Sequence, residues 1–224
     1  MSTTEELLTT VAENMQSVYE AGKASGSGGD DAFWDAIQDY GNRTSYIYAF
    51  SRTNFKTFKA KYGFDNVQCN NMFNACKSEE IEINSNTIIS PTYMFGGCEN
   101  LLRVKGHIGV ASGEVGYMFY NSKALKCIDS LDFTNISSKN SIYAFHNTSA
   151  LEEVRFIGTI PCDMKFSYSN LLSYESLMSI INALKDYSED TSGTTYTLTL
   201  GTTNLAKLSN AEKAIATEKG WTLA

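Results

Sequence analysis

The chain lacks the features that mark nucleic-acid-binding, membrane-spanning and secreted proteins. Its 18 Lys and Arg residues are outnumbered by 25 Asp and Glu residues, which gives the 224-residue chain a net charge of −7. Nucleic-acid phosphates require a basic face, so we expect no nucleic-acid partner. No stretch approaches the roughly 20 apolar residues that span a bilayer, so we expect no membrane insertion. Residues 1–6 are acidic, without the apolar core of a secretory signal, so we expect synthesis in a cytosol.

Cysteine and histidine are too few and too scattered to indicate a metal centre or a disulfide framework. The five cysteines form no Cys-x-x-Cys pair, and their number is odd. Cys76 and Cys98 share one phase of the repeat described below, so we expect them to be small buried core residues. The two histidines, His107 and His146, have no orienting third group that the sequence marks. We therefore expect no metal, no cofactor and no catalytic residue.

An aromatic triplet that recurs between residues 48 and 171 organises the rest of the chain. Each triplet ends in phenylalanine, and the steps between successive phenylalanines are 23, 22, 24, 26 and 21 residues. The six phenylalanines are Phe50, Phe73, Phe95, Phe119, Phe145 and Phe166. A small residue follows three positions after each of them: Thr53, Cys76, Cys98, Ser122, Thr148 and Ser169. This period predicts a solenoid of the leucine-rich-repeat type, with the phenylalanines in one column, because a single unit cannot bury its own apolar face.

Short strands accompany the repeat, at 81–83, 103–104, 126–128 and 153–156. Charged and aliphatic residues alternate in them, which predicts one buried face and one face in water. The residues expected on the wet face are Glu82, Arg103, Lys105, Lys126, Glu153 and Arg155. The connections at 106–116 and 134–141 are rich in Gly, Ser and Asn, so we expect loops there.

The first part of the chain, residues 1–24, predicts an oligomerising coiled-coil helix. Its apolar seam follows heptad spacing and consists of Leu8, Val11, Met15 and Val18. Residues 25–30 are a Gly/Ser-rich flexible linker. A tethered helix has little reason to pack on its own domain, which favours self-association; the alternative is an amphipathic helix that lies on its own domain.

Atypical units are expected at both ends of the repeat, because a solenoid must cover its terminal coils. Residues 31–47 predict an N-terminal helical cap with an aromatic face; the alternative is an aromatic sugar-stacking platform. Residues 172–224 predict an αβαβ cap with helices at 173–185 and 209–219 and strands at 196–200 and 221–223. Ser209 and Glu212 form the sequence pattern of a capping box. The expected fold class is therefore α/β: a leucine-rich-repeat-like solenoid between a coiled-coil helix and an αβαβ cap.

The repeat unit, an aromatic-Met/Ala-Phe triplet followed by Cys/Ser/Thr and then Leu and Val/Ile, resembles the BspA-like leucine-rich repeat of bacterial surface proteins. Both ends of the chain narrow this resemblance. Residues 18–23, 32–36 and 41–44 are similar to the opening of tail proteins from phages and prophages of Gram-positive bacteria. Residues 205–208, 212–216 and 219–223 are similar to the ending of those proteins. The Gly/Ser linker departs from the family opening, which usually runs directly from the helix to Phe-Trp.

The resemblance implies a non-enzymatic receptor-binding or tail-fibre protein of a phage tail or baseplate. Such a protein is made in the bacterial cytoplasm and ends in the virion. The resemblance further implies a homo-oligomer, usually a trimer, that contacts other tail proteins through its N-terminal helix and host cell-wall glycan or protein through its repeats. A baseplate spacer without receptor contact is also compatible. The residues that the solenoid does not need, and that are therefore candidates for host-surface binding, are Arg103, His107, Tyr120, Lys126, His146 and Arg155.

Two other functions stay open. A cell-wall-degrading enzyme of the tail would need a cleft that holds two carboxylates at catalytic distance. Adjacent acids such as Glu152 and Glu153 point to opposite faces of a strand, so the sequence marks no such pair. A bacterial surface adhesin is the third possibility, and the missing secretory signal fits it poorly.

Overall fold

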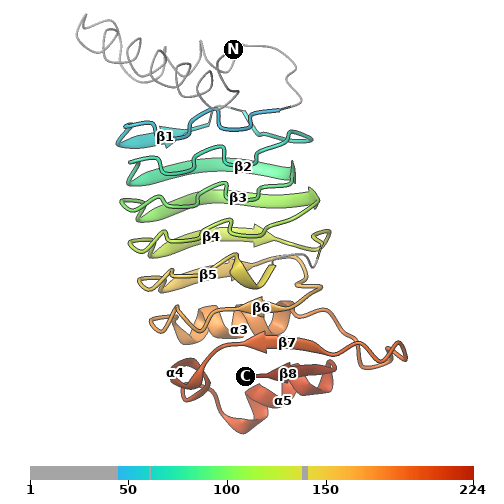
Figure 1. The fold of residues 1–224 in the computed structure, drawn as a ribbon. Helices are drawn as coiled ribbons and strands as arrows, with labels where there is room; N and C mark the ends of the chain where they lie inside the picture. The colour runs from blue at the N-terminus through green and yellow to red at the C-terminus, as the bar shows by residue number, and fades with distance from the viewer. Residues whose placement is uncertain (1–44, 61, 138–140) are drawn as a thin grey trace, which may run out of the picture.

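The computed structural model describes residues 45–60, 62–137 and 141–224 (Figure 1). These residues form an α/β structure with two parallel sheets, and the helices gather toward the C-terminus. Within the described ranges, no helix combines the length and the apolar character needed to cross a bilayer. The expected linker at 25–30 and the cap up to residue 44 lie outside these ranges. So do the four expected oligomerisation residues, Leu8, Val11, Met15 and Val18.

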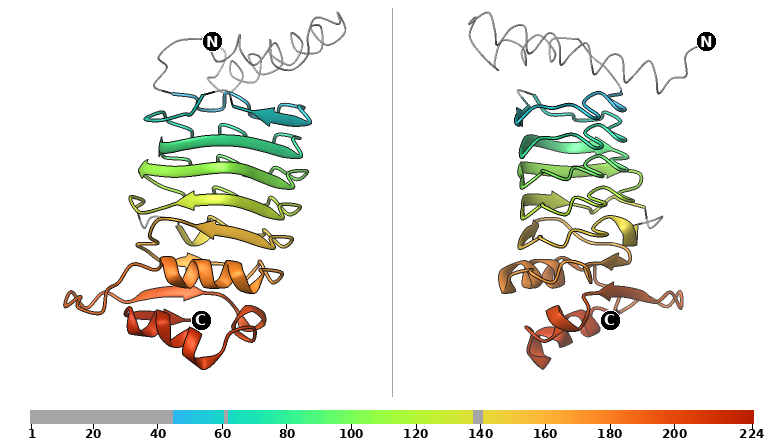
Figure 2. Two further views of the ribbon diagram at one scale, coloured as in Figure 1. Left: turned by 180° about the vertical axis from the view of Figure 1, so that it is seen from behind. Right: turned by 60° about the vertical axis from the view of Figure 1, so that its left-hand side comes forward.

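The larger sheet has five parallel strands that neighbour one another in chain order. Its strands are β1 (Thr57–Lys59), β2 (Glu80–Ile89), β3 (Arg103–Ser112), β4 (Cys127–Asp132) and β5 (Glu153–Phe156). Equivalent aliphatic residues pair across it: Ile81 with Val104, Val104 with Ile128, and Ile128 with Val154. The sequence period is therefore a spatial period, in which each repeat forms one coil and adds one strand (Figures 1 and 2).

The six repeat phenylalanines form one continuous column in the core, as the period predicts. Each is at most 1% exposed. Successive ring centroids lie 5.2, 5.6, 5.3, 5.3 and 4.5 Å apart, and every pair is stacked. Each such aromatic pair contributes about 0.5–1.5 kcal/mol beyond the burial of its area. The column thus joins each coil to the next.

The small residue three positions after each phenylalanine is buried, and in four of the six coils it donates a hydrogen bond to the carbonyl of a repeat phenylalanine. The hydroxyls of Thr53 and Thr148 donate to the carbonyl of the phenylalanine in their own coil, both at 2.8 Å. Ser122 reaches the preceding coil and donates to the Phe95 carbonyl at 2.6 Å, and the Cys98 thiol donates to the Phe73 carbonyl at 3.0 Å. The expected burial of Cys76 and Cys98 is confirmed.

The expected loop at 106–116 is wrong in its first half, because β3 continues to Ser112. His107 therefore lies in a strand and pairs with Asn84 of β2. Gly106 lies within this strand, where two coils approach closely. A Cβ at this position would lie 2.3 Å from the Ile83 carbonyl oxygen, and the φ of Gly106 is +85°, so the position requires glycine. Strand β4 begins at Cys127, so Lys126 lies just before it and not within it.

The C-terminal part consists of a second parallel sheet and three helices. The sheet has the order β6 (Met164–Lys165), β7 (Tyr196–Thr199) and β8 (Trp221–Leu223). The helices are α3 (Tyr174–Ala183), α4 (Thr202–Leu205) and α5 (Asn210–Glu218), and a short 3₁₀ helix, η1 (Ser141–Tyr143), precedes this part. Strands β7 and β8 pair in parallel. The expected capping box of Ser209 with Glu212 is confirmed.

Helix α3 covers the outer edge of β5, which has no neighbouring strand. Two of its serine side chains form hydrogen bonds with the backbone of β5. The Val154 N–H donates to Ser176 Oγ at 3.0 Å, and the Phe156 N–H donates to Ser179 Oγ at 2.8 Å. Ser176 Oγ in turn donates to the Glu152 carbonyl at 3.2 Å. The last strand of the larger sheet thus finds partners for its backbone where a sixth strand would otherwise lie, which protects the edge from pairing with another chain.

Candidate functional site

Ion pairs between neighbouring coils occupy most cations on the wet face of the larger sheet. Arg103 donates to Asp129 Oδ1 through Nη2 at 2.7 Å and through Nε at 3.1 Å. Lys105 lies 2.7 Å from Glu80, and Lys126 lies 4.0 Å from Glu152. Arg103 and Lys126, two of the sequence-predicted binding residues, are therefore engaged with neighbouring coils. Each exposed pair contributes little stability, typically below about 1 kcal/mol.

His107 contacts a polar side chain of the next coil, whereas Arg155 forms no ion pair with a described carboxylate. The ring Nδ1 of His107 lies 3.0 Å from the Ser130 hydroxyl of the next coil. Arg155 is exposed, and within the described ranges no carboxylate lies within ion-pair distance of it. Of the candidates on this face, Arg155 alone thus presents a guanidinium that no described carboxylate neutralises.

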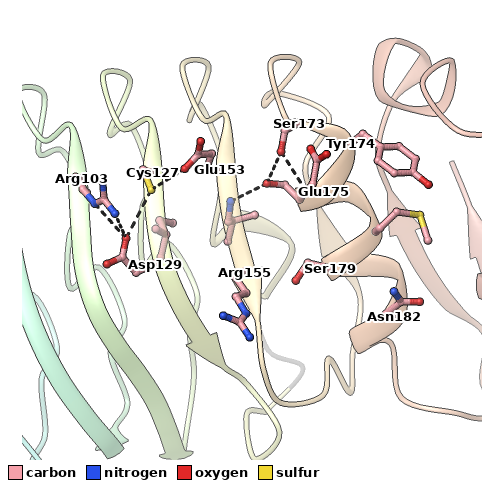
Figure 3. A pocket seen from close by; sticks show the side chains of 14 residues that line it. Arg103, Cys127, Asp129, Glu153, Arg155, Ser173, Tyr174, Glu175, Ser179 and Asn182 are labelled. Atoms are coloured by element: carbon pink, nitrogen blue, oxygen red, sulfur yellow. Dashed lines mark hydrogen bonds and ion pairs between the residues drawn. The ribbon is translucent and has the colours of Figure 1, made fainter.

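A cleft of about 870 Å³ lies between the wet face of β4 and β5 and helix α3 (Figure 3). We call it the sheet-face cleft. Strand residues form one wall and α3 forms the other. Its polar and charged lining consists of Arg103, Cys127, Asp129, Glu153, Arg155, Ser173, Tyr174, Glu175, Ser176, Ser179 and Asn182. The volume falls within the range of small-molecule sites, and the lining is mixed in charge.

Cys127 is the one cysteine of the five that is not buried, and the sheet-face cleft includes it. Its thiol lies 3.4 Å from Glu153 Oε2 and 3.7 Å from Asp129 Oδ1. Burial, followed by the hydrogen bond to Glu153, raises the pKa of this thiol to about 12. A nucleophilic cysteine needs a lowered pKa, so this environment disfavours covalent catalysis by Cys127.

A second candidate site is a group of half-buried aromatic rings on the turns between the strands. We call it the aromatic surface. It consists of Tyr93, Tyr117, Tyr120, Tyr143, His146 and Tyr168, which come from four consecutive coils. All six are neither fully buried nor fully exposed.

The rings of the aromatic surface form two ladders. In one ladder, Tyr93 stacks on Tyr117 at 4.5 Å and Tyr117 on Tyr143 at 4.9 Å, with interplanar angles of 1° and 3°. In the other, Tyr120 stacks on His146 at 5.3 Å, and the His146 and Tyr168 centroids lie 4.3 Å apart. Of the sequence-predicted binding residues, the structure brings Tyr120 and His146 together here. It places Arg103, His107 and Arg155 on the larger sheet and Lys126 just before β4.

Sequence reasoning missed Tyr93, Tyr117 and Tyr143, although a signal was present. Each is the first residue of an aromatic triplet, so the repeat that placed the phenylalanines in the core also places these rings in register outside it. Tyr93 and Tyr117 have φ values of +55° and +61°. A left-handed conformation costs a non-glycine residue roughly 1–2 kcal/mol, so the stacking of the rings offsets backbone strain.

Tyr93 senses the neighbouring tyrosines. Its pKa is raised, first by partial burial and then by Tyr117 and Tyr120. At neutral pH the Tyr93 phenol is therefore an uncharged donor and acceptor. Because stacked rings cover one another's faces, the ladder presents mainly ring edges and hydroxyls to a partner.

Comparisons with protein-family models, with curated proteins and with solved structures found no match to this chain. Among the described residues, no group of three or more His, Cys, Asp and Glu side chains is arranged to hold a metal ion.

Proposed function

We propose that the protein is a non-enzymatic binding and structural component of a phage tail or baseplate, which recognises the bacterial host surface through a leucine-rich-repeat-like solenoid. The resemblance of the repeat and of both chain ends supports this assignment. The stacked coils also support it, because a column of phenylalanines with one strand per coil is a rigid scaffold on which surface residues hold fixed positions.

The aromatic surface is the observation that carries the binding role. Six half-buried rings from four coils lie in mutual contact, outside the phenylalanine column that holds the coils together. Tyrosine is enriched at recognition surfaces because it combines a large apolar body with a hydroxyl and loses little entropy on binding. Two residues that the sequence singled out for host-surface binding, Tyr120 and His146, belong to it.

The proposed assembly is a homo-oligomer, of which the trimer is the form that the resemblance implies. In this proposal residues 1–24 gather the copies and attach them to other tail proteins, and the repeats contact host cell-wall glycan or protein. In this proposal the protein resides in the virion.

Co-sedimentation with purified Gram-positive cell walls tests the binding role. We expect the full-length protein to pellet with walls of host strains and to release no soluble wall fragments. A protein that stays in the supernatant with every wall of a broad strain panel would contradict the proposal.

A cell-wall-degrading activity is the second candidate, because the sheet-face cleft contains three carboxylates, Asp129, Glu153 and Glu175. Asp129 already accepts hydrogen bonds from Arg103 and from the Gly106 N–H at 3.1 Å, which leaves Glu153 and Glu175 as the acid–base candidates. This candidate predicts fragment release that Glu153→Gln abolishes; release that persists in that variant would exclude the cleft as its source.

A further inference from the structure

The first tyrosine ladder ends at Tyr143, which also lines a second cavity that is separate from the sheet-face cleft. This end cavity measures about 710 Å³. Its lining residues come from η1 and its neighbours, from the segment before β6 and from the start of β7: Ile136, Ile142, Tyr143, Pro161, Cys162, Asp163, Thr194, Thr195 and Tyr196. Tyr143 belongs both to the ladder and to the cavity, so the two are continuous.

Four tyrosines border this continuous surface. Tyr93, Tyr117 and Tyr143 follow one another along the stack of coils, and Tyr196 lines the cavity with Tyr143. Tyr196 is held by Tyr187, whose ring stacks on it at 3.8 Å and whose hydroxyl donates to the Pro161 carbonyl at 2.6 Å. We call the four residues Tyr93, Tyr117, Tyr143 and Tyr196, together with the end cavity, the tyrosine track. This arrangement suits an elongated ligand that runs from coil to coil along the stack.

Tyr143 and Asp163 give the end cavity its chemical character. Tyr117 stacks on one face of Tyr143, and His146 contacts the ring at a tilt, with 6.0 Å between the centroids; the ring also lines the cavity. Asp163 Oδ1 accepts a hydrogen bond from the Thr197 N–H at 2.7 Å, which fixes the carboxylate. Its Oδ2 receives no hydrogen bond from the described part of the chain, so it is a ready acceptor for ligand hydroxyls. Thr194 and Thr195 add hydroxyl-bearing side chains to the same wall.

The described lining of the end cavity disfavours polyanionic ligands. Asp163 is the only carboxylate among its described lining residues, and no Lys or Arg is among them. At these residues a phosphate-rich polymer would meet a negative charge without a compensating cation.

The backbone beside the ladder is unsuited to an extended peptide. The N–H groups of Tyr93 and Phe95 already donate to the carbonyls of Gly116 and Met118 in the next coil. A peptide strand binds mainly through free main-chain groups at a sheet edge, and these turns offer none at those positions. The ring edges and hydroxyls of the ladder, together with the fixed carboxylate of Asp163, instead suit a polyhydroxylated ligand, whose hydroxyls find donors and acceptors there.

We infer that the tyrosine track binds an uncharged cell-wall polysaccharide, with one sugar unit in the end cavity against Tyr143 and its hydroxyls on Asp163. This inference rests on the proposed host-surface binding, and it adds the class of ligand and its position. Within the end cavity, Tyr143 and Asp163 are the residues that we expect to contact the sugar.

The test measures binding of the full-length protein to Gram-positive walls that are untreated, protease-treated or periodate-oxidised, with soluble teichoic acid as competitor. We expect binding to survive protease, to be lost after periodate oxidises the sugars, and to be unaffected by teichoic acid. Tyr143→Ala and Asp163→Asn should each weaken binding at least about tenfold, as for a central contact. Tyr62→Ala, a matched change at a tyrosine outside the track, should leave it unchanged.

Each outcome separates this inference from the proposed function. Wall binding that protease removes, or that teichoic acid competes away, would overturn the polysaccharide and leave host-surface binding in place. Undiminished binding by folded Tyr143→Ala and Asp163→Asn proteins would overturn the location. Asp163→Asn keeps an oxygen that can accept the hydrogen bond from the Thr197 N–H, so this variant should fold. It therefore still tests the location if Tyr143→Ala does not fold. No binding to any wall would contradict the proposed function itself.

Discussion

Single residues in this protein act through repetition, because one side chain in each coil meets its equivalent in the next. Phe119 illustrates this best, since it stacks on both Phe95 and Phe145 at 5.3 Å. Tyr117 occupies the corresponding position in the outer ladder and contacts Tyr93 and Tyr143. Removing a ring therefore breaks two contacts and leaves a gap in the middle of the column.

Phe119→Ala should destabilise the fold by about 3–5 kcal/mol, the cost of emptying a fully buried aromatic site. Phe119→Leu fills most of the volume and should cost less. Chemical denaturation of both variants measures the difference. Equal stabilities for Phe119→Ala and the parent protein would mean that the column does not hold the coils together.

The donor position after each phenylalanine makes a finer prediction. Ser122→Ala removes the hydrogen bond to the Phe95 carbonyl and should cost about 1 kcal/mol. Ser122→Thr should be close to neutral, because Thr53 and Thr148 occupy this position in other coils. The comparison of the two free energies of unfolding tells whether the position requires a donor or only a small side chain.

At the scale of elements, the ends of the repeat show how helices complete a parallel sheet. Ser176 and Ser179 of α3 lie three residues apart on one helical face and meet the alternate N–H groups of Val154 and Phe156. The double variant Ser176→Ala with Ser179→Ala should be less stable by roughly 1–3 kcal/mol for each N–H group left without a partner. Chemical denaturation of the double variant and of the parent protein measures this difference. A variant of parental stability would show that the serines are dispensable.

Helix α5 gives a pH dependence. A hydrogen bond from the Tyr174 hydroxyl, followed by bonds at Ser209, lowers the pKa of Glu212. A carboxylate whose pKa is lower in the folded state stabilises the fold at pH values above its ordinary pKa, and this contribution is lost as pH falls below about 4. Glu212→Gln should therefore reduce stability at pH 7 and have less effect at acidic pH, in denaturation curves compared at both values. A difference of the opposite sign would contradict this.

The sequence predicts elements well where the period is strict and poorly where geometry between coils decides. The phenylalanines, the donor positions and the Ser209 capping box all follow from local spacing. The extension of β3 through Gly106 does not, because that glycine reflects the 2.3 Å approach that a Cβ would make to Ile83 of another coil. The sequence does not predict the end cavity either. Its lining combines Tyr143 of the repeat with Asp163 and Tyr196, which come from separate segments of the chain.

For the molecule as a whole, the proposal assigns self-association to residues 1–24, which precede the coils. At the C-terminal end of the coils, Phe166 directly follows β6 of the smaller sheet, which β7 and β8 complete (Figure 1). We therefore expect deletion of residues 1–24 to leave a folded monomer, and the full-length chain to form an oligomer. Analytical ultracentrifugation of both proteins measures this. A monomeric full-length protein would exclude the proposed role of the N-terminal helix.

Host-surface binding through the aromatic surface is the central claim, and wall co-sedimentation of Tyr120→Ala with His146→Ala tests it most directly. These two rings contact each other at 5.3 Å and lie outside the core column, so the double variant should fold. We predict that it binds host walls at least about tenfold more weakly than the parent protein. Unchanged affinity for those walls in the folded double variant would contradict the claim.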